Sequence, residues 1–171
     1  MPDRLADLPD DARCWVFAAE RPLNEDEQHA VLDHLDRFFD GWRSHGRPVE
    51  GAAAMHEGRF LVVGGLRDDA GISGCGIDAV VREIEAAAGA LGTGWLTPLL
   101  VFWRDADGTI QHGPRGTFRR LVRQGAVTAG TPVFDLSLTT LGELRRHGLE
   151  RPAGRSWHAR VFRIPEATAS R

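Results

Sequence analysis

The sequence predicts an α+β fold in which two helices cover one face of an antiparallel sheet. Two segments, 25–42 and 77–91, repeat their apolar residues with helical spacing. Short runs rich in Val, Leu and aromatic residues, at 14–19, 60–66 and 99–103, have the length and composition of strands. Glycine, proline and aspartate separate these segments, so turns or helices connect the strands.

The first strand is expected at 14–19, and a helix follows it. Asn24 and Glu27 have the spacing of a capping box at the start of this helix, and Gly46 stops it. Its apolar stripe consists of Val31, Leu32, Leu35, Phe38, Phe39 and Trp42.

A hairpin and a second helix come next. The strands 49–56 and 59–66 flank Glu57-Gly58, a short turn, and the second strand is apolar on both faces, as expected of a central strand. Asp68-Asp69 is expected to solvate the following loop. The second helix is marked by Ile77, Val80, Val81, Ile84, Ala88 and Leu91.

The second half of the chain predicts shorter elements. They are, in order, strands at 99–103 and 109–111, a helix around 118–122, a strand at 133–134, a helix at 138–147 and a strand at 157–164. In the last strand, alternation would place Trp157 in the core and His158 in solvent.

Up to Trp103, the order strand, helix, strand, strand, helix, strand is that of the ferredoxin-like arrangement, the split βαβ unit. Residues 1–95 are therefore expected to form an acidic ferredoxin-like unit, whose last strand is 98–104. Residues 96–171 are expected to form a small basic α/β lobe, which either packs on the first unit as one core or stands apart from it.

Composition excludes several classes of protein. The chain of 171 residues contains 42% hydrophobic and 26% charged residues, as soluble globular proteins do. The polar, acidic start of the chain lacks the pattern of a secretory signal, which favours a cytoplasmic location and no membrane partner. All 21 basic residues are arginine, so neither a Walker-type ATPase nor a Schiff-base enzyme can be built.

The charge is distributed unevenly. Residues 1–95 carry 18 acidic residues and 9 arginines, whereas residues 96–171 carry 6 acidic residues and 12 arginines. The two halves attract each other, within one chain or across a homodimer, or the basic half binds an acidic partner. Arg115, Arg119, Arg120 and Arg123 could follow phosphates, but the net charge of −3 and the lack of interleaved aromatic residues rank nucleic-acid binding third.

The region from Trp103 onward resembles the bacterial GYF-like modules. The features that match are Trp103, Asp107-Gly108, Gly113-Pro114, Leu121-Val122, Gly125, Val127, Thr131 and Val133-Phe134. The resemblance implies the fold of such a module. The Gly-Tyr-Phe triplet of the domains that bind proline-rich peptides is absent, and Phe134 stands where these modules carry tryptophan.

The whole chain is similar to a family of uncharacterised bacterial proteins that are often labelled as ATPases of ABC transporters. The matching segments are Ser73 to Asp78, with the pattern Ser-Gly-Cys-x-Ile-Asp, and Ser156 to Arg160, with the pattern Ser-Trp-His-Ala-Arg. The resemblance implies a shared fold and a shared site, but the chain has no phosphate-binding loop that would support the label.

The first candidate site is the turn Ser73 to Asp78 before the second helix. The free N–H groups of a helix start favour an anion or a thiolate, so Ser73, Gly74, Gly76 and Asp78 are candidate ligand contacts and Cys75 a candidate nucleophile. A tight turn without chemistry is the alternative reading.

The second candidate site is the segment Ser156 to Arg160. Trp157 and Arg160 could contact a ligand, and His158 could act as a base for Cys75. The leading hypothesis is a non-enzymatic binding protein with an unknown small ligand or protein partner. A cysteine-dependent enzyme is the alternative, and phosphate binding by the basic lobe is third. No cofactor is expected, and no metal either, because His56, His112 and His158 lack the spacing of paired ligands.

Overall fold

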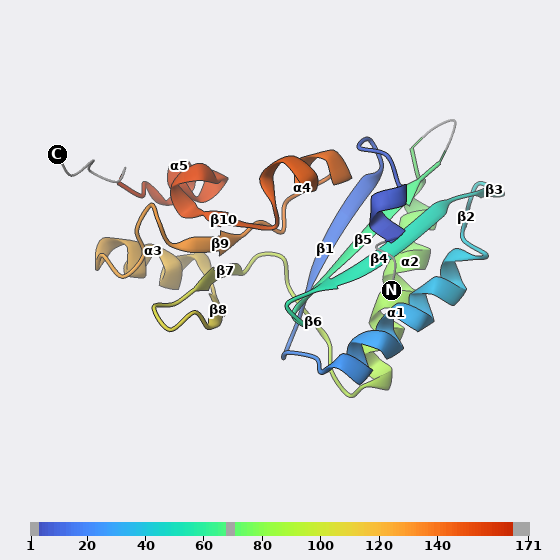
Figure 1. Cartoon of the computed structure of the whole chain (residues 1–171), viewed down its shortest axis with the longest axis horizontal. Helices are drawn as coiled ribbons and strands as arrows, with labels where there is room; N and C mark the ends of the chain where they lie inside the picture. Colours follow the sequence, from blue (N-terminus) through green and yellow to red (C-terminus); the bar gives the residue numbers. More distant parts are fainter. Residues whose placement is uncertain (1–3, 68–70, 166–171) are drawn as a thin grey trace. The chain divides into compact units, whose positions relative to one another are not determined.

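The chain forms two compact units in the computed structural model, which describes residues 4–67 and 71–165 (Figure 1). The first unit takes its residues from Met1–Leu96 and Ser137–Arg146, and the second from Thr97–Leu136 and His147–Arg171. Both combine helices with an antiparallel sheet, so the expected α+β class is confirmed. The expected turn at Asp68-Asp69 lies outside the described residues.

The first unit contains a four-stranded antiparallel sheet. Its strands are β1 (Arg13–Ala19), β4 (Glu50–His56), β5 (Phe60–Leu66) and β6 (Trp95–Leu96), in the order β4-β5-β1-β6. The predicted hairpin is present as β4 and β5, and the prediction that β5 is central is confirmed. Its turn requires the left-handed region, because Glu57 has φ 56° and Gly58 has φ 59°.

Helices α1 (Glu25–Phe39) and α2 (Gly74–Ala90) lie against one face of this sheet (Figure 1). The predicted capping box starts α1: Asn24 accepts from the Glu27 N–H at 2.9 Å, and Glu27 accepts from the Asn24 N–H at 2.9 Å. The helix ends at Phe39, before the expected stop. The core between the two helices and the sheet includes Val31, Leu35, Phe39, Trp42, Leu61, Val63, Val80 and Ile84.

The opposite face of the sheet is covered at the centre of β5. A Cβ atom on Gly64 would lie 2.9 Å from Leu8 and 3.2 Å from Leu141, so these side chains press on the backbone there. Leu8 follows a 3-10 helix at Arg4–Asp7, and Leu141 starts α4 (Leu141–His147). This cover explains why β5 is apolar on both faces.

The predicted helix at 138–147 is confirmed as α4, which begins at Leu141 and is capped by Thr140. The Thr140 hydroxyl accepts from the Glu143 N–H at 3.2 Å, and the Glu143 carboxylate accepts from the N–H of Thr139 at 2.8 Å. Arg145 then donates to Asp10 at 2.5 Å and to the carbonyl oxygen of Leu8 at 2.6 Å. The segment 137–146 therefore belongs to the acidic first unit, although it lies in the basic half of the sequence.

The strand expected at 98–104 is present as β7 (Val101–Arg104), but it pairs in the second sheet. The fourth strand of the first sheet is the two-residue β6, which the sequence analysis missed. A strand of two residues is too short to show a periodic pattern. Trp95 is held in place by its indole N–H, which donates to the Ile84 carbonyl oxygen at 2.9 Å.

The second unit has an antiparallel sheet of its own, in the order β10-β9-β7-β8. The additional elements are β8 (Ile110–Gly113), α3 (Arg115–Arg123), β9 (Pro132–Phe134), β10 (Glu150–Pro152), a 3-10 helix at Ala153–Arg155 and α5 (Trp157–Phe162). Its core includes Val101, Trp103, Phe118, Val127, Val133, Phe162 and Ile164.

The strand expected at 157–164 is wrong, because this segment is the helix α5. Ser156 caps it by accepting from the N–H of His158 at 3.2 Å. The buried positions are His158 and Phe162, which are four residues apart and share a helix face. Burial of this pair fits a strand as well, but a strand would place Arg160 on the same face, and Arg160 is exposed, as a helix requires.

Candidate functional site

The turn from Ser73 to Asp78 forms the first turn of α2. Ser73 is the N-cap, and its hydroxyl accepts from the Gly76 N–H at 3.2 Å. A second serine anchors the cap from outside: the Ser44 hydroxyl accepts from the Ser73 N–H at 2.9 Å and lies 2.9 Å from the Ser73 hydroxyl. Ser44 itself is held by β2 (Arg43–Ser44), which pairs with β3 (Arg47–Pro48).

Gly76 is required by close packing in this turn. Its Cβ atom would lie 3.0 Å from Ile72 and 3.2 Å from Ser44. Its carbonyl oxygen accepts from the indole N–H of Trp42 at 2.9 Å. The serines and Gly76 are thus used to dock the start of α2 on Trp42 and Ser44, which supports the structural reading of the motif.

The two cysteines occupy opposite environments. Cys75 and Asp78 are exposed on the first turn of α2, with Gly74 exposed beside them. Cys14 is buried on β1, and burial, with a smaller contribution from the negative charge of Glu143, raises the pKa of its thiol to about 11. Only Cys75 is therefore presented to reagents in solution.

We expect a thiol reagent such as iodoacetamide to modify one cysteine in the folded protein at pH 8 and two after unfolding. The Cys75→Ser variant should then be unreactive when folded, and the Cys14→Ala variant should react like the wild type, because Cys14 is shielded and protonated. Intact-mass spectrometry gives the count. Modification of Cys14 in the folded protein would contradict its burial.

His158 lies in the interior of the second unit, so the expectation that it faces solvent is wrong. Its side chain is 0% exposed and stacks on Trp157 with a centroid distance of 3.8 Å. The Ser156 hydroxyl donates to the Ala153 carbonyl oxygen at 3.0 Å, so the proton between Ser156 and His158 Nδ1, 2.8 Å apart, belongs to the imidazole. His158 Nε2 has no hydrogen-bond partner among the described residues.

Burial also makes His158 a poor base. It lowers the pKa of the imidazole to about 4; the charge of Asp135 opposes this shift, and those of Arg151 and Arg115 add to it. His158 and Cys75 belong to different units, so their pairing stays a prediction. No hydrogen bond or ion pair joins Cys75 to a histidine or carboxylate within 4–67 and 71–165.

A buried carboxylate organises this part of the second unit. Asp135, directly after β9, is 2% exposed; it pairs with the guanidinium of Arg151 and accepts from the indole N–H of Trp157 at 3.0 Å. Nothing in the sequence singled out Asp135, because an aspartate after a short strand usually solvates a turn. This cluster holds Trp157 in place and leaves Arg160, the last site residue of the segment, exposed.

A groove with a volume of about 590 Å³ lies between α3 and the end of α5. We call it the basic groove. It is lined by Arg119, Val122, Arg123, Val161, Phe162, Arg163 and Pro165. Arg119 and Arg123 are one turn apart on α3, and Arg163 follows α5, so guanidinium groups come from two elements. The Arg119 guanidinium lies over the ring of Phe162, 5.7 Å from its centroid.

The arginines around this groove are not neutralised. Two arginines of the unit are paired: Arg104 binds both oxygens of Glu150, at 2.6 and 2.7 Å, and Arg151 binds Asp135. The others make no hydrogen bond or ion pair with a carboxylate that the structure describes: Arg115, Arg119, Arg120, Arg123, Arg155, Arg160 and Arg163. The sequence indicated the arginines of α3 through their spacing. It did not indicate that Arg163 joins them, because the segment 157–164 was expected to be a strand.

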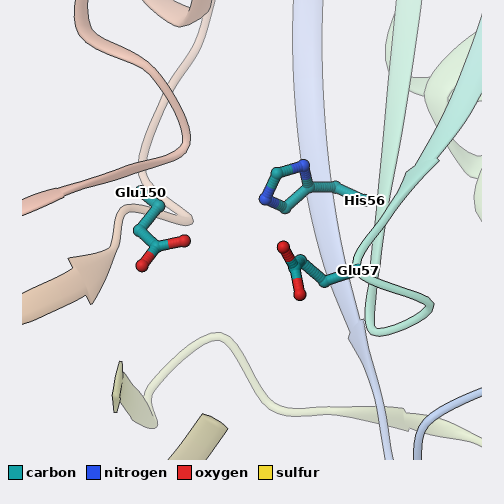
Figure 2. A group of neighbouring side chains, drawn as sticks. All are labelled: His56, Glu57 and Glu150. Atoms are coloured by element: carbon teal, nitrogen blue, oxygen red, sulfur yellow. The ribbon is translucent and has the colours of Figure 1, made fainter. Parts of the chain in front are cut away.

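Potential metal ligands do not gather within either unit. His56 and Glu57 stand at the turn between β4 and β5, and Glu150 on β10 (Figure 2). Glu150 belongs to the second unit and is engaged by Arg104, whereas the other two belong to the first. Inside a single unit, the described residues offer no group of three histidine, cysteine or carboxylate ligands.

The comparisons with known proteins give no match: no family model, no curated protein and no solved structure is similar to this chain. None of the described helices is long and apolar enough to cross a membrane.

Proposed function

We propose that this is a non-enzymatic binding protein and that its basic groove binds an anionic partner. The observation that carries the proposal is a set of three exposed arginines, Arg119, Arg123 and Arg163, which make no ion pair with a described carboxylate. They line the basic groove together with apolar residues. Guanidinium groups bind carboxylates and phosphates through two parallel hydrogen bonds, and the partner would supply the negative charge for these three arginines.

The structure offers less to the alternatives. At the turn Ser73 to Asp78, the Ser73 hydroxyl bonds Ser44 and the Gly76 N–H, and the Gly76 carbonyl oxygen bonds Trp42, so a ligand site there stays a prediction. For a cysteine-dependent enzyme, a base must reach the thiol, and no such contact is made by Cys75 in the part of the chain that the structure describes.

The proposal is tested with fluorescein-labelled poly-L-glutamate as the probe. We expect anisotropy to show binding that weakens steeply between 50 and 200 mM salt, by analogy with polyanions that release counterions. Arg119→Gln should lower the affinity about tenfold, because hydrogen bonds to charged groups contribute roughly 1.5–3 kcal/mol.

Arg120→Gln is the matched control, since Arg120 is an exposed arginine on the same helix but outside the groove. It should change the affinity by less than about twofold, as is typical of a charge at the rim of an interface. Equal effects of the two substitutions would show that binding depends on the overall positive charge of the unit, and the groove would be rejected as the binding site.

We further propose a ferredoxin-like fold for the first unit and a GYF-like fold for the second. The strand order β4-β5-β1-β6 with α1 and α2 on one face supports a ferredoxin-like first unit. The succession β7, β8, α3 and β9 supports a GYF-like second unit. We also propose membership of the uncharacterised bacterial family described above and a cytoplasmic location.

A further inference from the structure

The floor of the basic groove is apolar and partly open to solvent. Val122, Val161, Phe162 and Pro165 line it, and Val161 is 39% exposed, one of two large hydrophobic side chains exposed among the described residues. A floor of this kind contributes to binding only when an apolar group covers it. A ligand that consists of charge alone would leave it wet.

The aromatic residues near the groove are already engaged. Phe162 is 4% exposed and lies beneath Arg119, and Trp157 stacks on His158 and lies beneath Arg115, 5.8 Å from its ring centroid. Proteins that bind single-stranded nucleic acid stack bases on free aromatic faces. These rings therefore offer an apolar side chain a surface but offer a base no stacking platform.

The arrangement of charge around the floor indicates how a partner would lie. Arg119 and Arg123 lie on α3, one helical turn apart, and Arg163 directly follows α5. Arg163 has φ 53°, a left-handed conformation that ends α5 and is joined by a hydrogen bond from the Ile164 N–H to the Ala159 carbonyl oxygen, at 3.0 Å. Cations thus flank the floor from two elements.

We propose that the partner is a protein segment in which acidic residues flank a large apolar side chain. The apolar side chain would occupy the floor at Val161 and Phe162, and the flanking carboxylates would bind Arg119, Arg123 and Arg163. A volume of about 590 Å³ suits one or two side chains of a peptide. This inference rests on the proposed function, because it names the class of partner for the same groove.

The test compares three labelled probes of equal charge: a peptide of Asp and Glu with a central Leu-Phe pair, the same peptide with Ser-Ser, and a single-stranded oligonucleotide. We expect the Leu-Phe peptide to bind about tenfold more tightly than the Ser-Ser peptide. Val161→Ser should reduce this preference from about tenfold to about twofold. Leu99→Ser, which replaces the other exposed hydrophobic residue outside the groove, should change neither affinity.

The possible failures are distinguishable. If both peptides bind equally and Arg119→Gln still weakens them, the apolar anchor is overturned and the anionic site stands. If the oligonucleotide binds more tightly than the Leu-Phe peptide, the partner is a nucleic acid and the inference is overturned. If neither the peptides nor poly-L-glutamate bind, the inference and the proposed function fail together.

Discussion

Replacing Asp135 with alanine is expected to lower the free energy of unfolding by about 3–5 kcal/mol, the range found when one partner of a buried ion pair is removed. Asp135 is 2% exposed, and the Arg151 side chain that it neutralises is 15% exposed. The substitution leaves the buried guanidinium without its counter-charge and the indole N–H of Trp157 without its acceptor. Urea unfolding followed by tryptophan fluorescence measures the loss.

Three further variants separate the causes. Asp107→Ala, at an exposed acid of the same unit, should change stability by less than about 0.5 kcal/mol. Asp135→Asn keeps an oxygen that can accept from Trp157, so it should cost less than Asp135→Ala. Asp135→Ala combined with Arg151→Leu removes both charges and should recover part of the loss. A cost below about 1 kcal/mol for Asp135→Ala would show that Arg151 reaches solvent.

Acid is expected to destabilise the protein through His158. The pKa of this imidazole falls from 6.5 to about 4 on burial, so the unfolded chain binds the proton more tightly than the folded chain does. The stability that follows from keeping His158 neutral is complete above pH 6.5 and is lost as the pH falls towards 4. At 1.36 kcal/mol for each pKa unit, the loss amounts to about 3 kcal/mol, of which roughly 2 kcal/mol is reached by pH 5.

The measurement is urea unfolding between pH 7.5 and 5 for the wild type and for His158→Phe. Phenylalanine preserves a ring beside Trp157 and Phe162 but cannot bind a proton, and Ser156 keeps its bond to the Ala153 carbonyl oxygen. The variant should therefore lose about 2 kcal/mol less than the wild type over this range. His147→Gln controls for the loss of an exposed histidine. Parallel curves for wild type and His158→Phe would show that His158 is not the acid-sensitive group.

Periodic sequence features predicted much of the first unit. The apolar stripes of α1 and α2 span enough residues for the helical period to exclude that of a strand. The β4–β5 hairpin was indicated instead by its turn residues Glu57-Gly58 and by the apolar run of β5. The elements that were missed or misread are short. Trp95–Leu96 has only two residues, and the six residues of α5 fit a strand or a helix until Arg160 is known to be exposed between the buried His158 and Phe162.

The candidate sites divide in the same way. The segment Ser73 to Asp78 could be located from the sequence at the start of α2, because the signals that begin a helix lie in neighbouring residues. The basic groove joins α3 to a segment about 40 residues later, and the burial of Asp135 depends on Arg151 and Trp157, so neither could be derived from local spacing. Such tertiary contacts are what a single sequence does not encode in a readable pattern.

The segment Ser137–Arg146 belongs to the first unit but interrupts the second in the sequence, which affects how the protein is synthesised and how it can be truncated. The chain passes between the units three times, after Leu96, Leu136 and Arg146. Within the first unit, the Leu141 N–H donates to the Ala12 carbonyl oxygen at 3.0 Å, and the Cys14 N–H donates to that of Thr139 at 2.9 Å. During synthesis, the first unit is therefore complete only when residues 137–146 have left the ribosome, after residues 97–136 of the second unit. No single truncation of the gene therefore isolates either unit free of residues that belong to the other.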